Sequence, residues 1–279
     1  MKASAVLLAG GSGSRLQDPS GKKKQYLTLG GKPLICWSLE VLQRSSFIED
    51  IILVVPAGDE DYVREEILGA GAGDAKADPA GAVSADADRD LRFGKVKRIV
   101  AGGRERYHSV YEGLKAVWAL HADEDCGTVA GTGAGHATDA AANVFRATDR
   151  VVFIHDGARP FVTEEELQRL AEDVQKTGAC VLAVPAKDTI KRADRNRVVL
   201  ESLRREELWQ MQTPQVFRLS LVLEAHRRLT ENDATDDAMV VSLAFPEQQI
   251  LLTEGAYRNL KVTTPEDLII AEALAEHGR

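Results

Sequence analysis

Short apolar segments rich in β-branched residues alternate along this chain with segments of helical periodicity. The apolar segments span residues 3–9, 51–55, 96–100, 151–154 and 179–184, and the helical ones span residues 33–43, 59–68, 105–120 and 164–176. Such alternation predicts an α/β fold in which a mainly parallel, Rossmann-like sheet carries helices on both faces. Ligands bind at the carboxyl ends of the strands in sheets of this kind, so the residues that follow the apolar segments are candidates for a site.

The whole chain, residues 1–279, fits a single domain of this class, because 279 residues can bury a sizeable core. Two segments interrupt the alternation: residues 69–90 are mostly Ala, Gly and Asp, and residues 122–143 are rich in Ala, Gly and Thr. Neither has the large apolar side chains that offset the entropy of ordering a chain. We expect both to be flexible surface insertions, with short helices in their Ala-rich parts as the alternative.

Two helix starts are marked by their capping residues. Thr163 and Glu166 have the spacing of a capping box, which predicts the start of the helix at 164–176. Thr264 and Pro265 open a last helix, because proline favours the first helical position.

A glycine-rich loop at residues 9–15 follows the first apolar segment, and Lys24 comes nine residues after Arg15. Glycines allow backbone N–H groups to approach a phosphate closely, and the two cations suit a triphosphate. The spacing is not that of a P-loop, and Leu16 stands where the dinucleotide fingerprint needs its third glycine. The loop therefore indicates nucleotide binding of another kind, and a turn beside a solvated basic face is the alternative.

A second motif follows the apolar segment 151–154. It places Asp156 at the carboxyl end of the expected strand and Arg159 three residues later. A carboxylate there could hold Mg²⁺, and the guanidinium could hold a phosphate. The alternative is that the aspartate only caps a turn.

Four further clusters carry polar side chains. Residues 188–192 place a threonine beside two cations, which suits a phosphate monoester, although a solvated basic strand is the alternative. Residues 213–215 are polar but flanked by aromatic side chains, so we expect them to line a pocket wall. Residues 235–238 are typical of a helix N-terminus with acidic residues in its first turn. Residues 259–263 are expected to form a strand from which Lys261 points inward.

Charge and cysteine content limit the partners and the compartment. The net charge of −8 and the pI near 5.4 argue against a nucleic-acid-binding surface. The three cysteines form no C-x-x-C pair, and we expect a reducing cytoplasm. No signal peptide and no apolar run long enough for a membrane span are recognisable, so we expect no membrane partner.

Taken in order, the motifs resemble those of the 2-C-methyl-D-erythritol 4-phosphate cytidylyltransferase family. The resemblance rests on residues 9–15, 24–26, 102–106, 155–160, 188–191, 213–215, 235–238 and 259–263. Each motif is modest alone, whereas all of them in this order are specific. The resemblance implies a nucleotidyltransferase that joins CTP to a sugar-alcohol phosphate, 2-C-methyl-D-erythritol 4-phosphate, and releases pyrophosphate in the non-mevalonate isoprenoid pathway.

The resemblance also implies roles for single residues. Arg15 and Lys24 would form the catalytic pair that stabilises charge on the CTP α-phosphate. The residues implied in CTP binding are Ala9, Gly10, Gly11, Gly13, Gly103 and Ser109. The residues implied around the sugar phosphate are Asp156, Arg159, Thr189, Arg205, Thr213 and Lys261, and Asp156 is also the implied ligand of Mg²⁺ or another divalent cation.

The family is a homodimer, and its β-arm corresponds to residues 188–205 here. The arm is expected to reach into the partner subunit, so Thr189 and Arg205 would serve the neighbour's site. The alignment is ambiguous by one residue between Arg204 and Arg205, and Arg104 stands where some relatives carry an acid.

Two alternative functions stay open. A ribitol 5-phosphate cytidylyltransferase has a similar loop and arm, but the pair Gly157-Ala158 favours the erythritol enzyme. A non-catalytic nucleotide-binding sensor would not need Arg15 and Lys24 together with a metal-binding Asp156.

Overall fold

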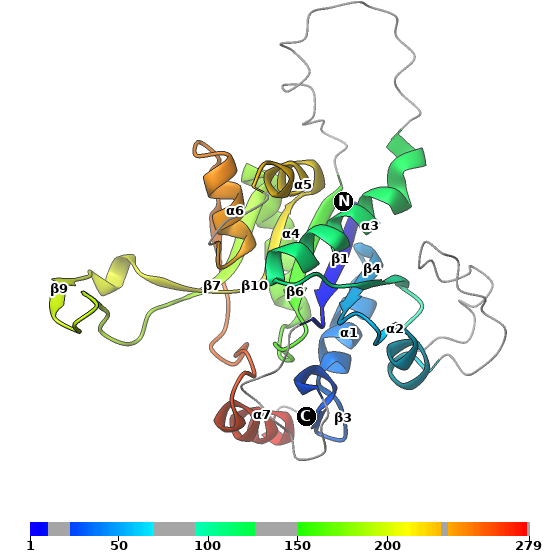
Figure 1. Ribbon diagram of the computed structural model, residues 1–279, viewed down its shortest axis with the longest axis horizontal. Helices are drawn as coiled ribbons and strands as arrows, with labels where there is room; N and C mark the ends of the chain where they lie inside the picture. The colour runs from blue at the N-terminus through cyan, green and yellow to red at the C-terminus, as the bar shows by residue number, and fades with distance from the viewer. Residues whose placement is uncertain (11–22, 70–92, 126–149, 230–233, 278–279) are drawn as a thin grey trace, which may run out of the picture.

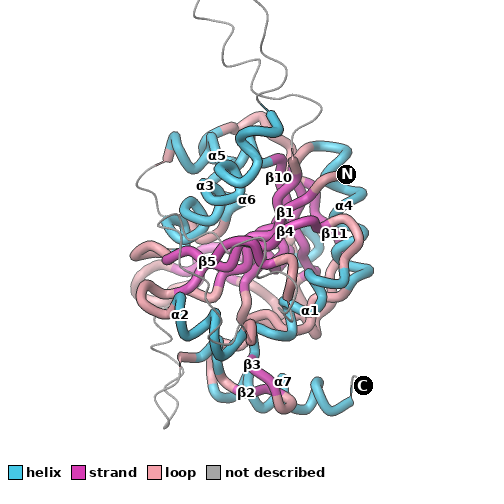
Figure 2. Tube along the Cα trace, turned by 90° about the vertical axis from the view of Figure 1, so that its right-hand side faces the viewer, coloured by secondary structure: helices cyan, strands magenta, loops and turns pink. Residues whose placement is uncertain are grey.

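The computed structural model describes residues 1–10, 23–69, 93–125, 150–229 and 234–277, without the side chains of Lys24 and of residues 123–125. A seven-stranded sheet with the order β11-β7-β10-β6-β1-β4-β5 crosses the molecule (Figures 1 and 2). Its strands are β1 (Ala3–Leu8), β4 (Ile48–Val55), β5 (Val96–Ala101), β6 (Val151–Asp156), β7 (Ala179–Pro185), β10 (Trp209–Arg218) and β11 (Leu251–Glu254). All neighbouring pairs are parallel except those of β10, which runs antiparallel to β6 and β7. The mainly parallel sheet is therefore confirmed.

Helices cover both faces of this sheet, as Figure 2 shows. They are α1 (Leu34–Arg44), α3 (Arg106–Asp125), α4 (Glu164–Thr177), α5 (Leu219–Arg228) and α6 (Asp237–Ala244). In β1, Ala5 and Leu7 belong to the core cluster shared with α1 and α4, whereas Val6 and Leu8 belong to the cluster shared with α3, α5 and α6. Successive side chains of a strand point to opposite faces, so an apolar run such as β1 is buried on both sides.

Local signals place several helix ends. The Thr163 hydroxyl accepts a hydrogen bond from the Glu166 backbone N–H at 3.2 Å, and the Glu166 carboxylate accepts one from the Thr163 N–H at 2.9 Å. This capping box starts α4, and Gly178, with φ of 80°, ends it. The last helix, α7 (Pro265–His277), begins as expected after Thr264, whose hydroxyl accepts from the Asp267 N–H.

Three expected elements differ from the structure. The segment 59–68 is one α-helical turn, α2 (Glu60–Tyr62), continued by a wider π-helical turn over Val63–Ile67. Helix α3 continues to Asp125, so the first residues of the segment 122–143 are helical, as alanine and glutamate there favour. Residues 259–263 do not form a strand: Val262 bonds only to the Ala158 carbonyl, and Thr263 and Thr264 already cap α7 through Asp267. Flexible insertions were expected at residues 69–90 and 122–143, and most of both segments, residues 70–90 and 126–143, lies outside the described residues.

Two small parts extend the sheet domain. Strands β2 (Thr28–Leu29) and β3 (Lys32–Pro33) pair beside α7, and Leu29, Leu34 and Ala271 belong to the separate core cluster formed there. Strands β8 (Lys191–Ala193) and β9 (Val199–Ser202) form a two-stranded sheet of their own. This sheet projects from the body between β7 and β10, as Figure 1 shows. These two strands therefore lie outside the central sheet.

Charged side chains are buried at the edge of the sheet where β1 and β4 begin. The Asp50 carboxylate of β4 contacts His121 Nε2 at 2.9 Å and Arg150 Nη1 at 3.2 Å. His121 lies near the end of α3, and Arg150 directly precedes β6. The residues on both sides of the segment 126–149 are therefore attached to one carboxylate. In the described parts of the chain no helix has the length and apolar character of a membrane span.

Candidate active site

The carboxyl ends of β1 and β6 lie side by side, because Leu8 pairs with Asp156 in the parallel register. The backbone continues past β1 in contact with both neighbours: the Ala9 N–H donates to the Val54 carbonyl at 2.7 Å, and the Gly157 N–H donates to the Leu8 carbonyl at 2.9 Å. This edge is where a ligand site is expected in such a sheet.

The glycines at this edge allow close packing with the start of α3. The Gly103 N–H donates to the Ser109 hydroxyl at 3.1 Å, and that hydroxyl is 3.2 Å from the Glu105 carbonyl. A Cβ on Gly102 would lie 2.8 Å from the Ser109 oxygen, and one on Gly10 would lie 3.6 Å from it. The expected nucleotide-binding residues that are described, Ala9, Gly10, Gly103 and Ser109, thus belong to one region at the carboxyl edge.

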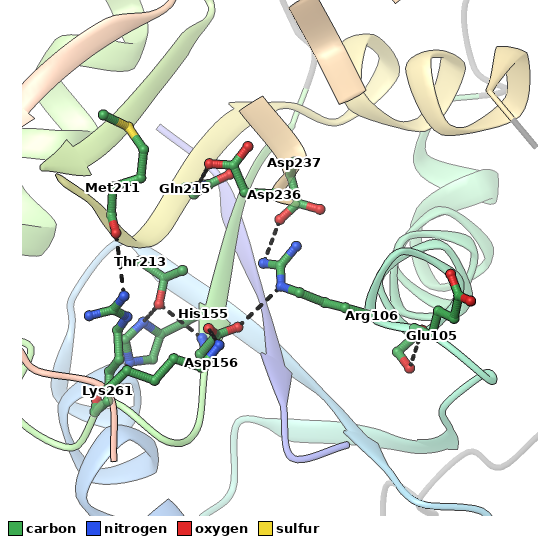
Figure 3. A network of polar contacts seen from close by, with 12 residues as sticks. Glu105, Arg106, His155, Asp156, Met211, Thr213, Gln215, Asp236, Asp237 and Lys261 are labelled. Atoms are coloured by element: carbon green, nitrogen blue, oxygen red, sulfur yellow. Dashed lines mark hydrogen bonds and ion pairs between the residues drawn. The ribbon is translucent and has the colours of Figure 1, made fainter. Parts of the chain in front are cut away.

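Asp156 is the centre of a group of charged side chains (Figure 3). Its Oδ2 accepts a hydrogen bond from Lys261 Nζ at 2.6 Å, and its Oδ1 lies 3.4 Å from Arg106 Nε. Burial alone would raise the pKa of the Asp156 carboxyl, but Arg106, Lys261 and Arg159 hold that pKa well below its usual range. The carboxylate is therefore ionised at neutral pH.

Arg159 is held by the backbone of two distant segments. Its Nη1 donates to the Asn259 carbonyl at 2.7 Å and its Nη2 contacts the Met211 carbonyl at 3.4 Å. The Asn259 amide donates in turn to the Thr213 carbonyl at 3.0 Å. Arg159 Nε is buried without a hydrogen-bond partner, but Nη1 and Nη2 each carry a second N–H that these two bonds do not use and that could serve an anion.

Thr213 is connected to the site through its hydroxyl. This oxygen accepts from the Asp156 N–H at 3.0 Å and lies 3.0 Å from His155 Nδ1, while His155 Nε2 lies 3.1 Å from the Arg159 carbonyl. Burial lowers the pKa of His155 to about 4, so the imidazole is neutral, with Nε2–H donating to the carbonyl and Nδ1 accepting from the threonine. The expected pocket-wall segment 213–215 is the middle of β10, and its residues are buried.

Arg106 links this group to α6. Its Nη2 donates to Asp237 Oδ2 at 2.8 Å, and Asp237 is completely buried. Asp236 caps α6 by accepting from the Met239 N–H at 2.9 Å, as the acidic helix start predicted. Gln215 binds both ends of this turn, since it donates to Asp236 and accepts from the Ala238 N–H, each at 2.9 Å.

The remaining candidate residues are not part of this group. Thr189 and Arg205 lie on the arm, where Arg205 Nη1 donates to the Lys187 carbonyl at 3.3 Å. Arg15, Gly11 and Gly13 lie outside the described residues. Lys24 begins the 3₁₀ turn η1 (Lys24–Tyr26), but its side chain is also outside the description.

Sequence reasoning assigned no role to Arg106 or His155, although both lie inside the motifs that carry the resemblance. His155 had a usable signal, because it precedes the key aspartate at the end of a fully apolar strand. Arg106 and Asp237 are 131 residues apart, and an ion pair at that separation leaves no local pattern.

Asp156 can be tested as a ligand for a divalent cation. Among the described residues there is no cluster of three or more His, Cys, Asp or Glu side chains that could hold a metal ion. Mg²⁺, however, is commonly bound by one or two carboxylates together with substrate phosphates and water. Asp156 fits that arrangement, because its Oδ1 has only the long contact with Arg106 whereas Oδ2 is occupied by Lys261.

Comparison with known proteins gives a consistent result over the whole chain. The sequence model described as IspD, 2-C-methyl-D-erythritol 4-phosphate cytidylyltransferase, matches residues 3–130 and 119–277. Proteins of that name from Halalkalibacterium halodurans and Alkaliphilus oremlandii are 38% and 34% identical to this chain, which is covered completely, with 100% and 97% of the relatives covered.

Solved structures agree with the sequence relatives. The crystal structure of 4-diphosphocytidyl-2C-methyl-D-erythritol synthase from Anaerococcus prevotii superposes with a TM-score of 0.71 at 26% identity, covering 99% of this chain and 96% of that one. The 2-C-methyl-D-erythritol 4-phosphate cytidylyltransferase from Thermus thermophilus gives a TM-score of 0.63 at 26% identity, covering 99% and 100%.

Proposed function

This chain belongs to the 2-C-methyl-D-erythritol 4-phosphate cytidylyltransferase family, and we propose that it carries out the reaction in that name. CTP and 2-C-methyl-D-erythritol 4-phosphate give the diphosphocytidyl product and pyrophosphate, in the synthesis of isoprenoid precursors. The observation that carries the proposal is the convergence of Asp156, Arg159 and Lys261 at the carboxyl edge, joined through Arg106 to the turn that contains Gly103.

The chemistry is a displacement at phosphorus. An oxygen of the sugar phosphate attacks the α-phosphorus of CTP, a new P–O bond forms, and the bond to the β-phosphate oxygen breaks as pyrophosphate leaves. No covalent enzyme intermediate is needed, so the protein acts by positioning the two anions and by stabilising charge. We assign the stabilisation of the α-phosphate to Arg15 and Lys24.

The sugar phosphate would bind the cations of the described group. Lys261 has three N–H donors and gives one of them to Asp156, and its side chain is 38% exposed. Arg159 adds the second N–H groups of Nη1 and Nη2, and its position is fixed by two backbone carbonyls. The Thr213 hydroxyl binds the Asp156 N–H and His155 Nδ1, and these two bonds fix the backbone that carries Asp156.

CTP would bind on the other side of Asp156, along the loop from Ala9 to Gly13 and the turn with Gly103 and Ser109. Backbone groups at glycines can read the edge of a pyrimidine, since no Cβ stands between the backbone and the base. The Asp156 carboxylate and the triphosphate would together hold Mg²⁺, which would neutralise phosphate charge when bound.

We also propose a homodimer in the cytoplasm. Val198, Val199 and Leu200 on the arm are each more than half exposed, and adjacent apolar residues on a projecting hairpin favour a protein partner. In an isologous dimer each arm would bring Thr189 and Arg205 to the partner's site. Cys36 and Cys180 are buried and are not joined to each other by a disulfide bond, which suits a reducing compartment.

A steady-state assay of pyrophosphate release tests the reaction. CTP with 2-C-methyl-D-erythritol 4-phosphate should give turnover, whereas CTP with ribitol 5-phosphate, or CTP without an acceptor, should give little. Equal or greater turnover with ribitol 5-phosphate would replace the proposed substrate, and CTP binding without turnover would favour a sensor.

Subunit mixing tests the shared site. Lys24→Ala and Arg205→Ala homodimers should each be poor enzymes, and their exchanged heterodimer should regain one intact site built from both chains. Arg204→Ala is the matched control on the arm and should stay active if Arg205 is the contact. Proven exchange without recovery of activity would show that Arg205 serves its own chain.

A further inference from the structure

Four charged side chains form one line from the substrate side to the interior. They alternate in sign: Lys261, Asp156, Arg106 and Asp237, with contacts of 2.6, 3.4 and 2.8 Å (Figure 3). Only Lys261 and Asp156 have a part in the proposed reaction. Arg106 and Asp237 therefore need their own explanation.

The inner end of this line is rigid. Asp237 has no exposed surface, and a buried carboxylate is stable as an anion only with a cation beside it. Its Oδ2 is bound by Arg106, and its Oδ1 lies 3.4 Å from His226 Nε2. Asp237 begins α6, whose start is capped by Asp236 and held to β10 by Gln215. Arg106 is thus attached to a fixed anchor.

The outer end depends on how the Asp156 carboxylate is oriented. Arg106 lies against Oδ1, so Oδ2 is the oxygen that faces Lys261. Without Arg106, no protein cation would lie on the Oδ1 side, and before a metal ion binds the carboxylate could rotate and bind the ammonium with both oxygens. Lys261, which already lies 2.6 Å from Oδ2, would then give a second N–H to Asp156 and would have fewer donors left for a substrate phosphate.

We propose that Arg106, anchored by Asp237, is a positioning residue that keeps Lys261 available to the sugar phosphate. Arg106 contacts Oδ1 of Asp156 and so fixes the orientation of that carboxylate. Asp237 in turn fixes the position of Arg106. This inference rests on the proposed function and adds two residues to it. It also gives a role to the acidic pair at residues 236–237, in which Asp236 caps the helix and Asp237 carries the charge.

The test removes both inner charges together. The double variant Arg106→Met, Asp237→Asn leaves no unpaired charge at the inner end, whereas Arg106→Met alone would leave two carboxylates without their shared cation. The KM for 2-C-methyl-D-erythritol 4-phosphate should rise at least tenfold in the double variant, and the KM for CTP should change less than threefold. Arg106→Lys, which keeps the charge but cannot form the same fork, should lie between the wild type and the double variant.

The matched control is the buried pair at the opposite edge of the sheet, in the double variant Arg150→Met, Asp50→Asn. It should lower the melting temperature without separating the two KM values. If the inner double variant changes both KM values equally, or neither, Arg106 only joins α3 to α6 and the inference is wrong. If the wild type shows no cytidylyl transfer at all, the proposed function fails first, and the two failures are distinguishable.

Discussion

The buried histidine of the site should make the protein's stability depend on pH in a calculable way. His155 is fully buried, its Nδ1 faces the Thr213 hydroxyl, and burial lowers its pKa from 6.5 to about 4. Between pH 6.5 and pH 4, His155 is therefore protonated in the unfolded chain but neutral in the folded protein. The stability that depends on neutral His155 is complete above pH 6.5 and is lost as the pH falls toward 4.

The size of the effect follows from the two pKa values. Between pH 7.5 and pH 5, His155 alone should remove about 2 kcal/mol from the free energy of unfolding. Urea denaturation of the wild type and of His155→Gln at both pH values, at one fixed protein concentration, measures it. Other titrating groups contribute to both proteins and cancel in the difference.

The variant should have a lower stability at pH 7.5 but a loss toward pH 5 that is about 2 kcal/mol smaller than that of the wild type. His277→Gln, at the exposed end of α7, is the control and should keep the wild-type dependence. Identical pH dependence in the wild type and His155→Gln would refute the assignment of a neutral buried imidazole.

Three further outcomes are expected. Arg15→Ala and Lys24→Ala should each lower turnover by about 10²-fold or more with little effect on the melting temperature, because each cation acts where charge develops on the CTP α-phosphate. Near-normal turnover of either variant in the pyrophosphate-release assay would contradict the catalytic assignment. Excess chelator should abolish activity, and Mg²⁺ should restore it; full activity in chelator would contradict a metal at Asp156. Cys36 and Cys180 are buried, and burial raises the pKa of the Cys180 thiol to about 12, so mass spectrometry after alkylation should find both unmodified until the protein unfolds.

The sequence predicted those helices and strands that are determined by residues close together in the chain. The strand before Asp156 and the helix that starts after Thr163 follow from an apolar run and a capping box, and both lie where expected. The antiparallel direction of β10 could not be predicted in this way, because a strand buried on both faces has the same composition in either direction.

The site was predictable in its motifs but not in its connections. Asp156, Arg159 and Lys261 were named from the sequence, and the structure brings them together. Lys261 was expected on a strand, yet the segment forms no strand ladder: Val262 bonds to Ala158, and Lys261 reaches the site on irregular chain. The bond from Arg159 to Asn259 spans 100 residues, and such a contact is determined by the fold rather than by neighbours in the sequence.

The attachment of His121 and Arg150 to Asp50 has a practical consequence for protein engineering. The chain leaves α3 and returns to β6 at points held by the same carboxylate, at the edge of the sheet away from the substrate groups. A peptide tag or a fluorescent protein inserted between residues 126 and 149 would be tethered at both ends to the same small region of the scaffold. The enzyme could then be immobilised or followed by light through an internal position, with the arm and the carboxyl edge left unmodified.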